Sequence, residues 1–288
     1  MTSARERAMI ESRLVRIGHS PDPDDAFMFY ALAKERLDTG GLRFQHLLEG
    51  IETLNGWALE GRLEVTAISA HAYAYVSDRY LLLPHGASVG RNYGPILVAK
   101  HGFDPSELLG KRIAVPGKLT TAFLALRLCL GEFDSVEVPF DRIFDSIEQG
   151  KAEAGLVIHE GQLTYSGRGF ARLLDLGTWW QETTGLPLPL GANAIRKDMG
   201  EPICLEISRL LRASIDYGLA HREAALRYAM QFGRGMDLPL ADRFVGMYVN
   251  DDTRAWNLES QRGLERLLDM AWEQGLIPKR VRPEFLSG

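Results

Sequence analysis

The feature that most constrains the fold is an internal echo between two halves of the chain. Residues 61–64 (Gly-Arg-Leu-Glu) precede an apolar run that ends at Ser69, and residues 150–153 (Gly-Lys-Ala-Glu) precede a run that ends at His159. Short apolar runs of this kind are typical of strands buried in a sheet. Although any alternating chain produces some echoes by chance, the repeated order indicates two related α/β lobes.

The same order of elements sets the expected lobe boundaries. A strand, a proline-containing loop and the start of a helix recur at residues 18–26 and 115–122. A proline-rich stretch just before residue 195 is extended, because a residue that precedes proline avoids the helical region, and it is the expected return crossing. We therefore expect one lobe from residues 1–98 with 195–288, a second lobe from residues 99–194, and a cleft between them.

The C-terminal part of the chain is predicted to be helical. Because this region lacks alternating strands, it cannot form a third lobe of the same kind, and we expect its helices to pack against the two lobes. Apolar residues recur with helical spacing over residues 203–219, 223–232, 241–248 and 258–274.

Charge and composition narrow the class of partners. The 288 residues include 33 basic and 38 acidic side chains, and the net charge of −5 gives no reason to expect nucleic acid or an anionic membrane as a partner. No stretch reaches the length of a membrane span, and residues 1–13 lack the apolar run of a secretory signal. These features predict a cytoplasmic protein, and they leave its oligomeric state open.

His159 is the first candidate catalytic residue. It follows the apolar run of residues 156–158, and ligands of open α/β sheets bind beyond the carboxyl ends of the strands. Imidazole changes charge near neutral pH, which suits proton transfer. A histidine with a purely structural role is the alternative interpretation.

A second candidate is the turn that leads into the helix predicted after residue 120. Free amides and the helix dipole favour an anion at such a place. The hydroxyl groups of Thr120 and Thr121 would hold a carboxylate there, unless one of these threonines is an ordinary helix cap. The glycine spacing of a phosphate-binding P-loop is missing before Lys118.

Other polar motifs predict neither a metal nor a cofactor. Asp22, Asp24 and Asp25 lie in a loop stiffened by prolines, and Asp24 or Asp25 is better explained as a helix cap than as a metal ligand. His71 and His85 lack a partner at zinc-ligand spacing. The sequence also lacks the Gly-x-Ser-x-Gly motif of serine esterases and the Gly-x-Gly-x-x-Gly turn of dinucleotide enzymes.

Several motifs together resemble one known family. They are Ser-Pro-Asp-Pro-Asp-Asp-Ala-Phe-Met-Phe at 20–29, Glu-Thr-Leu-Asn at 52–55, Trp-Ala-Leu-Glu-Gly-Arg at 57–62, Val-Pro-Gly at 115–117, Thr-Thr-Ala at 120–122, Ala-Gly-Leu-Val-Ile-His-Glu at 154–160 and Thr-Gly-Leu-Pro-Leu-Pro-Leu-Gly at 184–191. This set resembles the 1,4-dihydroxy-6-naphthoate synthase family of the futalosine route to menaquinone. The resemblance runs from about residue 16 to the final helices, and the last two motifs are the most specific.

The resemblance implies both a fold and an activity. The implied fold is that of the type 2 periplasmic binding proteins, with two α/β lobes, a cleft between them and a helical C-terminal region. The implied enzyme is a carbon–carbon lyase without a cofactor, which converts cyclic dehypoxanthinyl futalosine to 1,4-dihydroxy-6-naphthoate and releases dihydroxyacetone. By matching motifs, the proton acceptor is His159 and the residues in contact with this small carboxylate substrate are Ala67, Ile68, Ser69, Thr121 and Ala122.

This chain departs from the family pattern at the expected cleft. Family members typically read Ser-Pro-Cys-Pro-Asn-Asp, whereas this chain has Asp22 and Asp24, and a lysine is common where this chain has Ala67. Because the expected cleft lacks that lysine and has additional acidic side chains, the identity of the ligand stays open. Chorismate dehydratase of the same pathway and a non-catalytic solute-binding protein are therefore the alternative functions.

Overall fold

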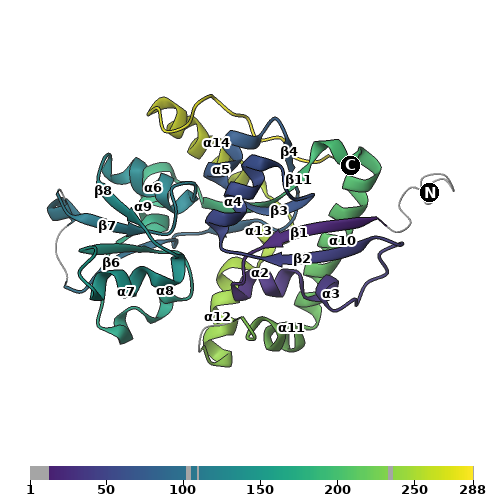
Figure 1. Cartoon of the computed structure of the whole chain (residues 1–288), viewed down its shortest axis with the longest axis horizontal. Coiled ribbons are helices and arrows are strands. Elements are labelled where there is room, and N and C mark those ends of the chain that lie inside the picture. The colour runs from purple at the N-terminus through teal and green to yellow at the C-terminus, as the bar shows by residue number, and fades with distance from the viewer. Residues whose placement is uncertain (1–12, 102–104, 109, 233–235, 288) are drawn as a thin grey trace.

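The computed structural model describes residues 13–101, 105–108, 110–232 and 236–287. It contains two mixed β-sheets, each flanked by helices, which lie side by side along the long axis of the molecule (Figure 1). The alternation of strands and helices in the first 200 residues largely follows the predicted order, but the sequence predicted neither the short strand at residues 88–90 nor the short helix at residues 161–164.

The first sheet carries the N-terminal strands. Its order is β2-β1-β3-β11-β4, with β5 paired to β11; β1 is parallel to β2 and β3, whereas β11 is antiparallel to β3. Because parallel strands end at the same edge of a sheet, the residues that follow β1 and β3 come together there. The strands are β1 (Leu14–His19), β2 (Arg43–Leu48), β3 (Val65–Ser69), β4 (Tyr80–Leu82), β5 (Ser88–Gly90) and β11 (Leu188–Arg196).

The second sheet is also mixed. Its order is β10-β6-β9-β7-β8, in which β7 is parallel to β8 and β9 while β6 is antiparallel to β9 and β10. An open parallel sheet is therefore only part of the arrangement around His159, which lies two residues beyond β9. The strands are β6 (Ile96–Ala99), β7 (Arg112–Val115), β8 (Asp134–Glu137), β9 (Ala154–Val157) and β10 (Ala171–Asp175).

Sheet membership locates the two crossings between the sheets. β6 already belongs to the second sheet, and β11 belongs to the first sheet along its whole length. This pattern favours crossings just before Ile96 and Leu188. The division into residues 1–98 with 195–288 and residues 99–194 remains a prediction.

Helices connect the strands within each half, and their ends follow local sequence signals. Thr120 caps α6, because its hydroxyl oxygen accepts the amide of Phe123 at 3.1 Å. Gly61 ends α4 in a left-handed conformation with φ of 68°. These helices are α4 (Ile51–Glu60), α5 (Ala70–Val76), α6 (Thr121–Leu130), α7 (Ile143–Glu148), α8 (Gly161–Thr164) and α9 (Leu176–Thr184), with 3₁₀ turns at Pro105–Leu108, Phe140–Arg142, Ser166–Arg168 and Lys197–Met199.

Two predicted helix starts were wrong in detail. The helix expected from residue 25 to residue 37 is two short helices, α2 (Pro23–Met28) and α3 (Tyr30–Ala33), and its N-cap is Asp22 without a side-chain capping bond. The sequence also predicts that Asp141 caps a helix that runs to residue 149, but Asp141 lies inside a 3₁₀ turn and the N-cap of α7 is Arg142. A short carboxylate before an apolar run signals a helix start only to within a few residues.

The C-terminal helices pack against both faces of the first half, as the sequence predicted. Helices α10 and α11 contact α2 and α3, whereas α14 contacts β11 and α5. Helix α12 contacts α2 and β5, which brings it beside the loop after β1. These helices are α10 (Glu201–Ala220), α11 (Arg222–Ala229), α12 (Leu238–Tyr248), α13 (Asp251–Arg254) and α14 (Leu258–Glu273).

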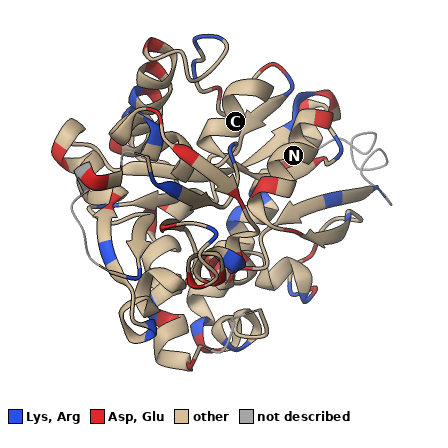
Figure 2. Cartoon of the chain, turned by 60° about the vertical axis from the view of Figure 1, so that its left-hand side comes forward, with Lys and Arg blue, Asp and Glu red and all other residues tan. Residues whose placement is uncertain are grey.

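Charged residues of both signs are interspersed over the molecule (Figure 2). The arrangement fits the slightly negative net charge of −5. In the described part of the chain, no helix combines the length and the apolar character needed to cross a membrane.

Candidate active site

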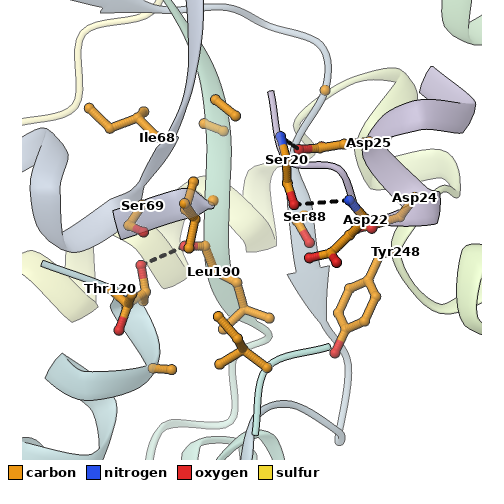
Figure 3. A pocket seen from close by; sticks show the side chains of 18 of the residues that line it. Ser20, Asp22, Asp24, Asp25, Ile68, Ser69, Ser88, Thr120, Leu190 and Tyr248 are labelled. Atoms are coloured by element: carbon orange, nitrogen blue, oxygen red, sulfur yellow. Dashed lines mark hydrogen bonds between the residues drawn. The ribbon is translucent and has the colours of Figure 1, made fainter. Parts of the chain in front are cut away.

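A cavity lies where the two sheets meet, and segments from both halves of the chain line it. It encloses about 770 Å³, its open mouth included. The loop after β1, the end of β3, the start of α6, strand β11 and helix α12 all contribute to its wall. Figure 3 shows Ser20, Asp22 and Asp24 on one side of the cavity and Ser69 and Thr120 on the other.

The structure brings together the five residues predicted to contact the substrate. Ala67, Ile68 and Ser69 come from β3, and Thr121 and Ala122 come from the start of α6; all of them line the cavity. These segments are fifty residues apart in the sequence, so only the packing of the two halves makes them neighbours.

Ser69 is held in place by a buried amide from the neighbouring helix α4. The Asn55 side chain donates to the Ser69 hydroxyl at 3.0 Å and accepts the Ser69 backbone amide at 2.9 Å. Both residues are buried, at 0% and 3% exposure, so these two bonds are shielded from water. Ser69 therefore presents a fixed hydroxyl at the carboxyl end of β3.

The two threonine hydroxyls at the α6 turn already have acceptors inside the protein. Thr120 donates to the Gly117 carbonyl at 2.8 Å, and Thr121 donates to the Leu190 carbonyl at 2.5 Å. A hydroxyl carries one proton, so in this arrangement neither side chain can donate to a carboxylate ligand. The capping interpretation is confirmed for Thr120, and a bound anion would have to use backbone amides.

One amide of this turn is also taken, by a carboxylate of the protein itself. Glu52 on α4 accepts the Leu119 amide at 3.0 and 3.1 Å, which joins the first half of the chain to the second. Gly117 makes room for it: its φ is +144°, and a Cβ there would overlap the Glu52 carboxylate. Burial raises the pKa of Glu52, and the Leu119 amide partly offsets that rise.

His159 lies beside the cavity, but it is not among the described residues that line the wall; its neighbour Ile158 is. The imidazole is buried at 5% exposure, between the ring edges of Phe140 and Phe144. Its Nδ1 accepts the Gly161 amide at 3.0 Å, so the neutral ring carries its proton on Nε2. A Cβ on Gly161 would lie 2.7 Å from His159 Cε1, so the ring packs tightly over this glycine.

The hydrogen bonding of His159 limits what its ring can do. Nε2 is buried and, among the described residues, has no hydrogen-bond partner. In this arrangement the ring presents a donor at Nε2 and no free acceptor. To accept a proton from a substrate, the ring must change tautomer or turn away from Gly161, and its predicted role as proton acceptor stays a prediction.

The loop after β1 forms an acidic side of the cavity, where the sequence predicted that residues 21–25 line the cleft. Asp22, Asp24 and Asp25 line the cavity together with Ser20 (Figure 3). Asp25 accepts the Ser20 amide at 2.7 Å, and the Ser20 hydroxyl accepts the Asp22 amide at 3.1 Å. The expected capping role of Asp24 or Asp25 is therefore wrong: Asp25 folds back onto the loop that precedes the helix.

Burial changes the protonation of these carboxyl groups. It raises the pKa of Asp25 to about 7, against the opposing effect of the Ser20 amide. Burial, and then the neighbouring Asp25 and Asp22, raise the pKa of Asp24 well above its ordinary value. Three carboxyl groups within four residues were the sequence signal, because neighbouring carboxyl groups that are withdrawn from water raise one another's pKa.

Helix α12 closes another side of the cavity. Phe244 and Tyr248 line the wall, and the Tyr248 hydroxyl donates to the Gln162 side chain of α8 at 2.8 Å. This bond joins the C-terminal helices to the second half of the chain. No local sequence pattern predicts this bond, since an apolar stripe with one tyrosine is typical of any packed helix.

The polarity of the wall sets what the cavity can hold. Among the described lining residues there is no lysine or arginine, so an anionic group would rely on backbone amides, on hydroxyls and on protonated carboxyls. A carboxyl group with a pKa near neutrality can also exchange protons with a ligand. In the described part of the chain, no cluster of three or more His, Cys, Asp or Glu side chains is arranged to hold a metal ion.

Comparisons with known proteins agree with this architecture. The chain is 43% identical to a 1,4-dihydroxy-6-naphthoate synthase of Thermus thermophilus over 94% of its own length and 99% of that protein, and 36% identical to one of Streptomyces coelicolor over 95% and 98%. A crystal structure of a protein from Archaeoglobus fulgidus shares 48% identity, covers 92% of this chain and 98% of its own, and has a TM-score of 0.88.

More distant structures share the fold alone. The alkanesulfonate-binding protein SsuA of Xanthomonas axonopodis, bound to MOPS, is 15% identical, with a TM-score of 0.72 over 95% of this chain and 97% of its own. The predicted fold of the periplasmic-binding-protein kind, with a helical C-terminal region, is confirmed. A family model described as menaquinone biosynthesis matches residues 15–273. The chain therefore belongs to the menaquinone biosynthesis family.

Proposed function

We propose that this protein is a 1,4-dihydroxy-6-naphthoate synthase, which converts cyclic dehypoxanthinyl futalosine to 1,4-dihydroxy-6-naphthoate and releases dihydroxyacetone. Its similarity over nearly the whole chain to two proteins of that name supports the activity. The observation that carries the proposal is the shared cavity: residues 67–69 and 121–122, which the resemblance assigns to the substrate, line one pocket.

The chemistry that we propose is the cleavage of a carbon–carbon bond by general acid–base catalysis. Such a step needs one group to remove a proton and another to return one. Asp25 suits either task, because its pKa of about 7 lets it hold or release a proton near neutral pH. His159 becomes a base only if its proton moves from Nε2 to Nδ1 or if Nδ1 is released from the Gly161 amide, and either change requires a movement of the turn at residues 159–161 when substrate binds.

The substrate that we propose is a small carboxylate handled without a cofactor, a nucleic acid or a membrane, in the cytoplasm. Its carboxylate would lie toward Ser69 and the start of α6, away from the aspartates, because the acidic wall repels a second anion whenever it is ionised. Hydroxyl groups of the substrate would face Asp22, Asp24 and Asp25, since carboxyl groups accept hydrogen bonds from hydroxyls.

Incubating the purified protein with cyclic dehypoxanthinyl futalosine tests the proposal. We expect naphthoate and dihydroxyacetone in equal amounts, measured by liquid chromatography with mass spectrometry. A non-catalytic binding protein would bind the compound and return it unchanged. A chorismate dehydratase would leave it unchanged and would consume chorismate instead.

A further inference from the structure

Two histidines lie directly behind the acidic loop of the cavity. His19 is the last residue of β1 and is 1% exposed; His46 is on the neighbouring strand β2. Their rings are 5.3 Å apart at 77°, and His19 stacks on Phe29 with ring centroids 4.5 Å apart. Neither histidine lines the described cavity wall, so the pair lies outside the site itself.

Hydrogen bonds connect this pair to the loop. His19 Nδ1 is 3.0 Å from the Ser20 carbonyl oxygen, and His19 Nε2 is 3.2 Å from His46 Nδ1. On its other side, Ser20 donates its backbone amide to the Asp25 carboxylate at 2.7 Å. Three contacts therefore connect β2 to the acidic loop: His46 to His19, His19 to Ser20, and Ser20 to Asp25.

The partners fix the tautomer of each ring. A carbonyl oxygen only accepts, so His19 Nδ1 carries the proton and, in the neutral ring, Nε2 is the acceptor. His46 must then donate from Nδ1, which leaves its Nε2 as a lone pair. That Nε2 is buried and has no partner among the described residues, as expected for an atom that carries no proton.

A second proton on His19 would disturb this arrangement. A proton on His19 Nε2 would face the proton on His46 Nδ1, so two donors would oppose each other at 3.2 Å. Burial, and then His46, lower the pKa of His19 to about 3, and burial lowers that of His46 to about 4. Both rings are therefore neutral near pH 7.

The loop has few other anchors on its backbone. Pro21 and Pro23 lack an amide proton, so they cannot donate a backbone hydrogen bond. Residues 20, 22, 24 and 25 of this loop all line the cavity. The His19 ring binds this segment at the Ser20 carbonyl oxygen. Because the Ser20 amide that binds Asp25 belongs to the same residue, the position of Ser20 affects the position of the Asp25 carboxyl group.

We propose that His46 and His19 form a neutral pair of Nδ1–H tautomers that positions Ser20, and through it the Asp25 carboxyl group, at the cavity wall. Both histidines are positioning residues, because neither reaches the cavity. The expected effect of the two histidines on turnover rests on the proposed function, whereas the expected tautomers of their rings do not depend on it.

Nitrogen NMR tests the tautomers without any substrate. In wild-type protein labelled with ¹⁵N-histidine, long-range ¹H–¹⁵N correlations at neutral pH should show His19 and His46 as neutral rings protonated at Nδ1. Spectra of His19→Asn and His46→Asn assign the two signals. A proton on Nε2 of either ring, or a charged ring at neutral pH, would overturn the proposal.

Turnover of cyclic dehypoxanthinyl futalosine tests the positioning role. His46→Leu removes the donor, and we expect kcat/KM per folded molecule to fall roughly tenfold, because a small misplacement of reacting groups can lower rates by up to about 10²-fold. His46→Asn keeps an N–H near the place of Nδ1 and should restore most of the loss. His221→Leu, a change at an exposed histidine, is the matched control.

Two results separate the possible failures. A His46→Leu protein with normal kcat/KM and only a lowered melting temperature would overturn the positioning role. Wild-type protein that shows the expected tautomers but forms no product would contradict the proposed function, and the spectra would still support the pair.

Discussion

At the scale of single residues, Asp25 connects the chemistry of the cavity to the stability of the fold. Burial makes its carboxylate harder to form in the folded protein than in the unfolded chain, and its pKa rises from 3.8 to about 7. A raised carboxyl pKa contributes stability that is present at low pH and is lost as pH rises through the folded pKa.

This direction of the pH dependence gives a prediction for Asp25→Asn, whose side chain cannot ionise. The free energy of unfolding of the variant, relative to that of the wild type, should increase as pH rises from about 4 to about 8. Urea denaturation of both proteins across this range measures the difference. A difference that stays constant with pH would mean that Asp25 titrates normally in the folded protein.

His159 gives a second residue-scale prediction. His159→Asn keeps a polar side chain but removes the imidazole, and we expect kcat to fall roughly 10²-fold or more, the usual contribution of general acid–base catalysis. Substrate affinity should change less, because Ser69 and the start of α6 are untouched. If the variant has a lower melting temperature but normal turnover per folded molecule, His159 is structural.

At the scale of elements, the sequence predicted best where a periodic run is bounded by a clear signal. The sequence predicts a helix over residues 51–60, closed by Gly61, and a strand over residues 65–69, and the structure has α4 and β3 with these bounds. The break at Phe29 and the 3₁₀ turn before α7 were missed, because both depend on packing rather than on local sequence.

The contact between α4 and the turn before α6 gives an element-scale prediction. Glu52→Ala leaves the half-buried Leu119 amide without its acceptor, and we expect the free energy of unfolding to fall by about 1 kcal/mol, the usual net contribution of one hydrogen bond. Glu52→Gln keeps an acceptor oxygen and should lose less. Equal stability of the two variants, measured by urea denaturation, would show that the amide is satisfied by water.

At the scale of the whole molecule, the sequence predicted two α/β halves and several residues that line the cavity between them, but not the complete cavity. The echo predicted Ser69 with the residue 21–25 loop on one wall and Thr121 with His159 on the other; Ser69 instead lies on the side of Thr120, and His159 is not among the described lining residues. The contribution of Tyr248 could not be predicted, since it depends on α12 packing across to Gln162 from far along the chain. The position of His159 behind the wall depends likewise on how the turn after β9 packs on Phe144.

The central claim is that this cavity converts cyclic dehypoxanthinyl futalosine to 1,4-dihydroxy-6-naphthoate, and one assay of three proteins tests it. Wild type and Ala220→Phe, a change at an exposed site, should form product at equal rates. Ala122→Phe fills the cavity, and its kcat/KM should fall by about tenfold or more, because a displaced substrate loses its reactive geometry. No product from the wild type, or full activity in folded Ala122→Phe, would contradict the claim.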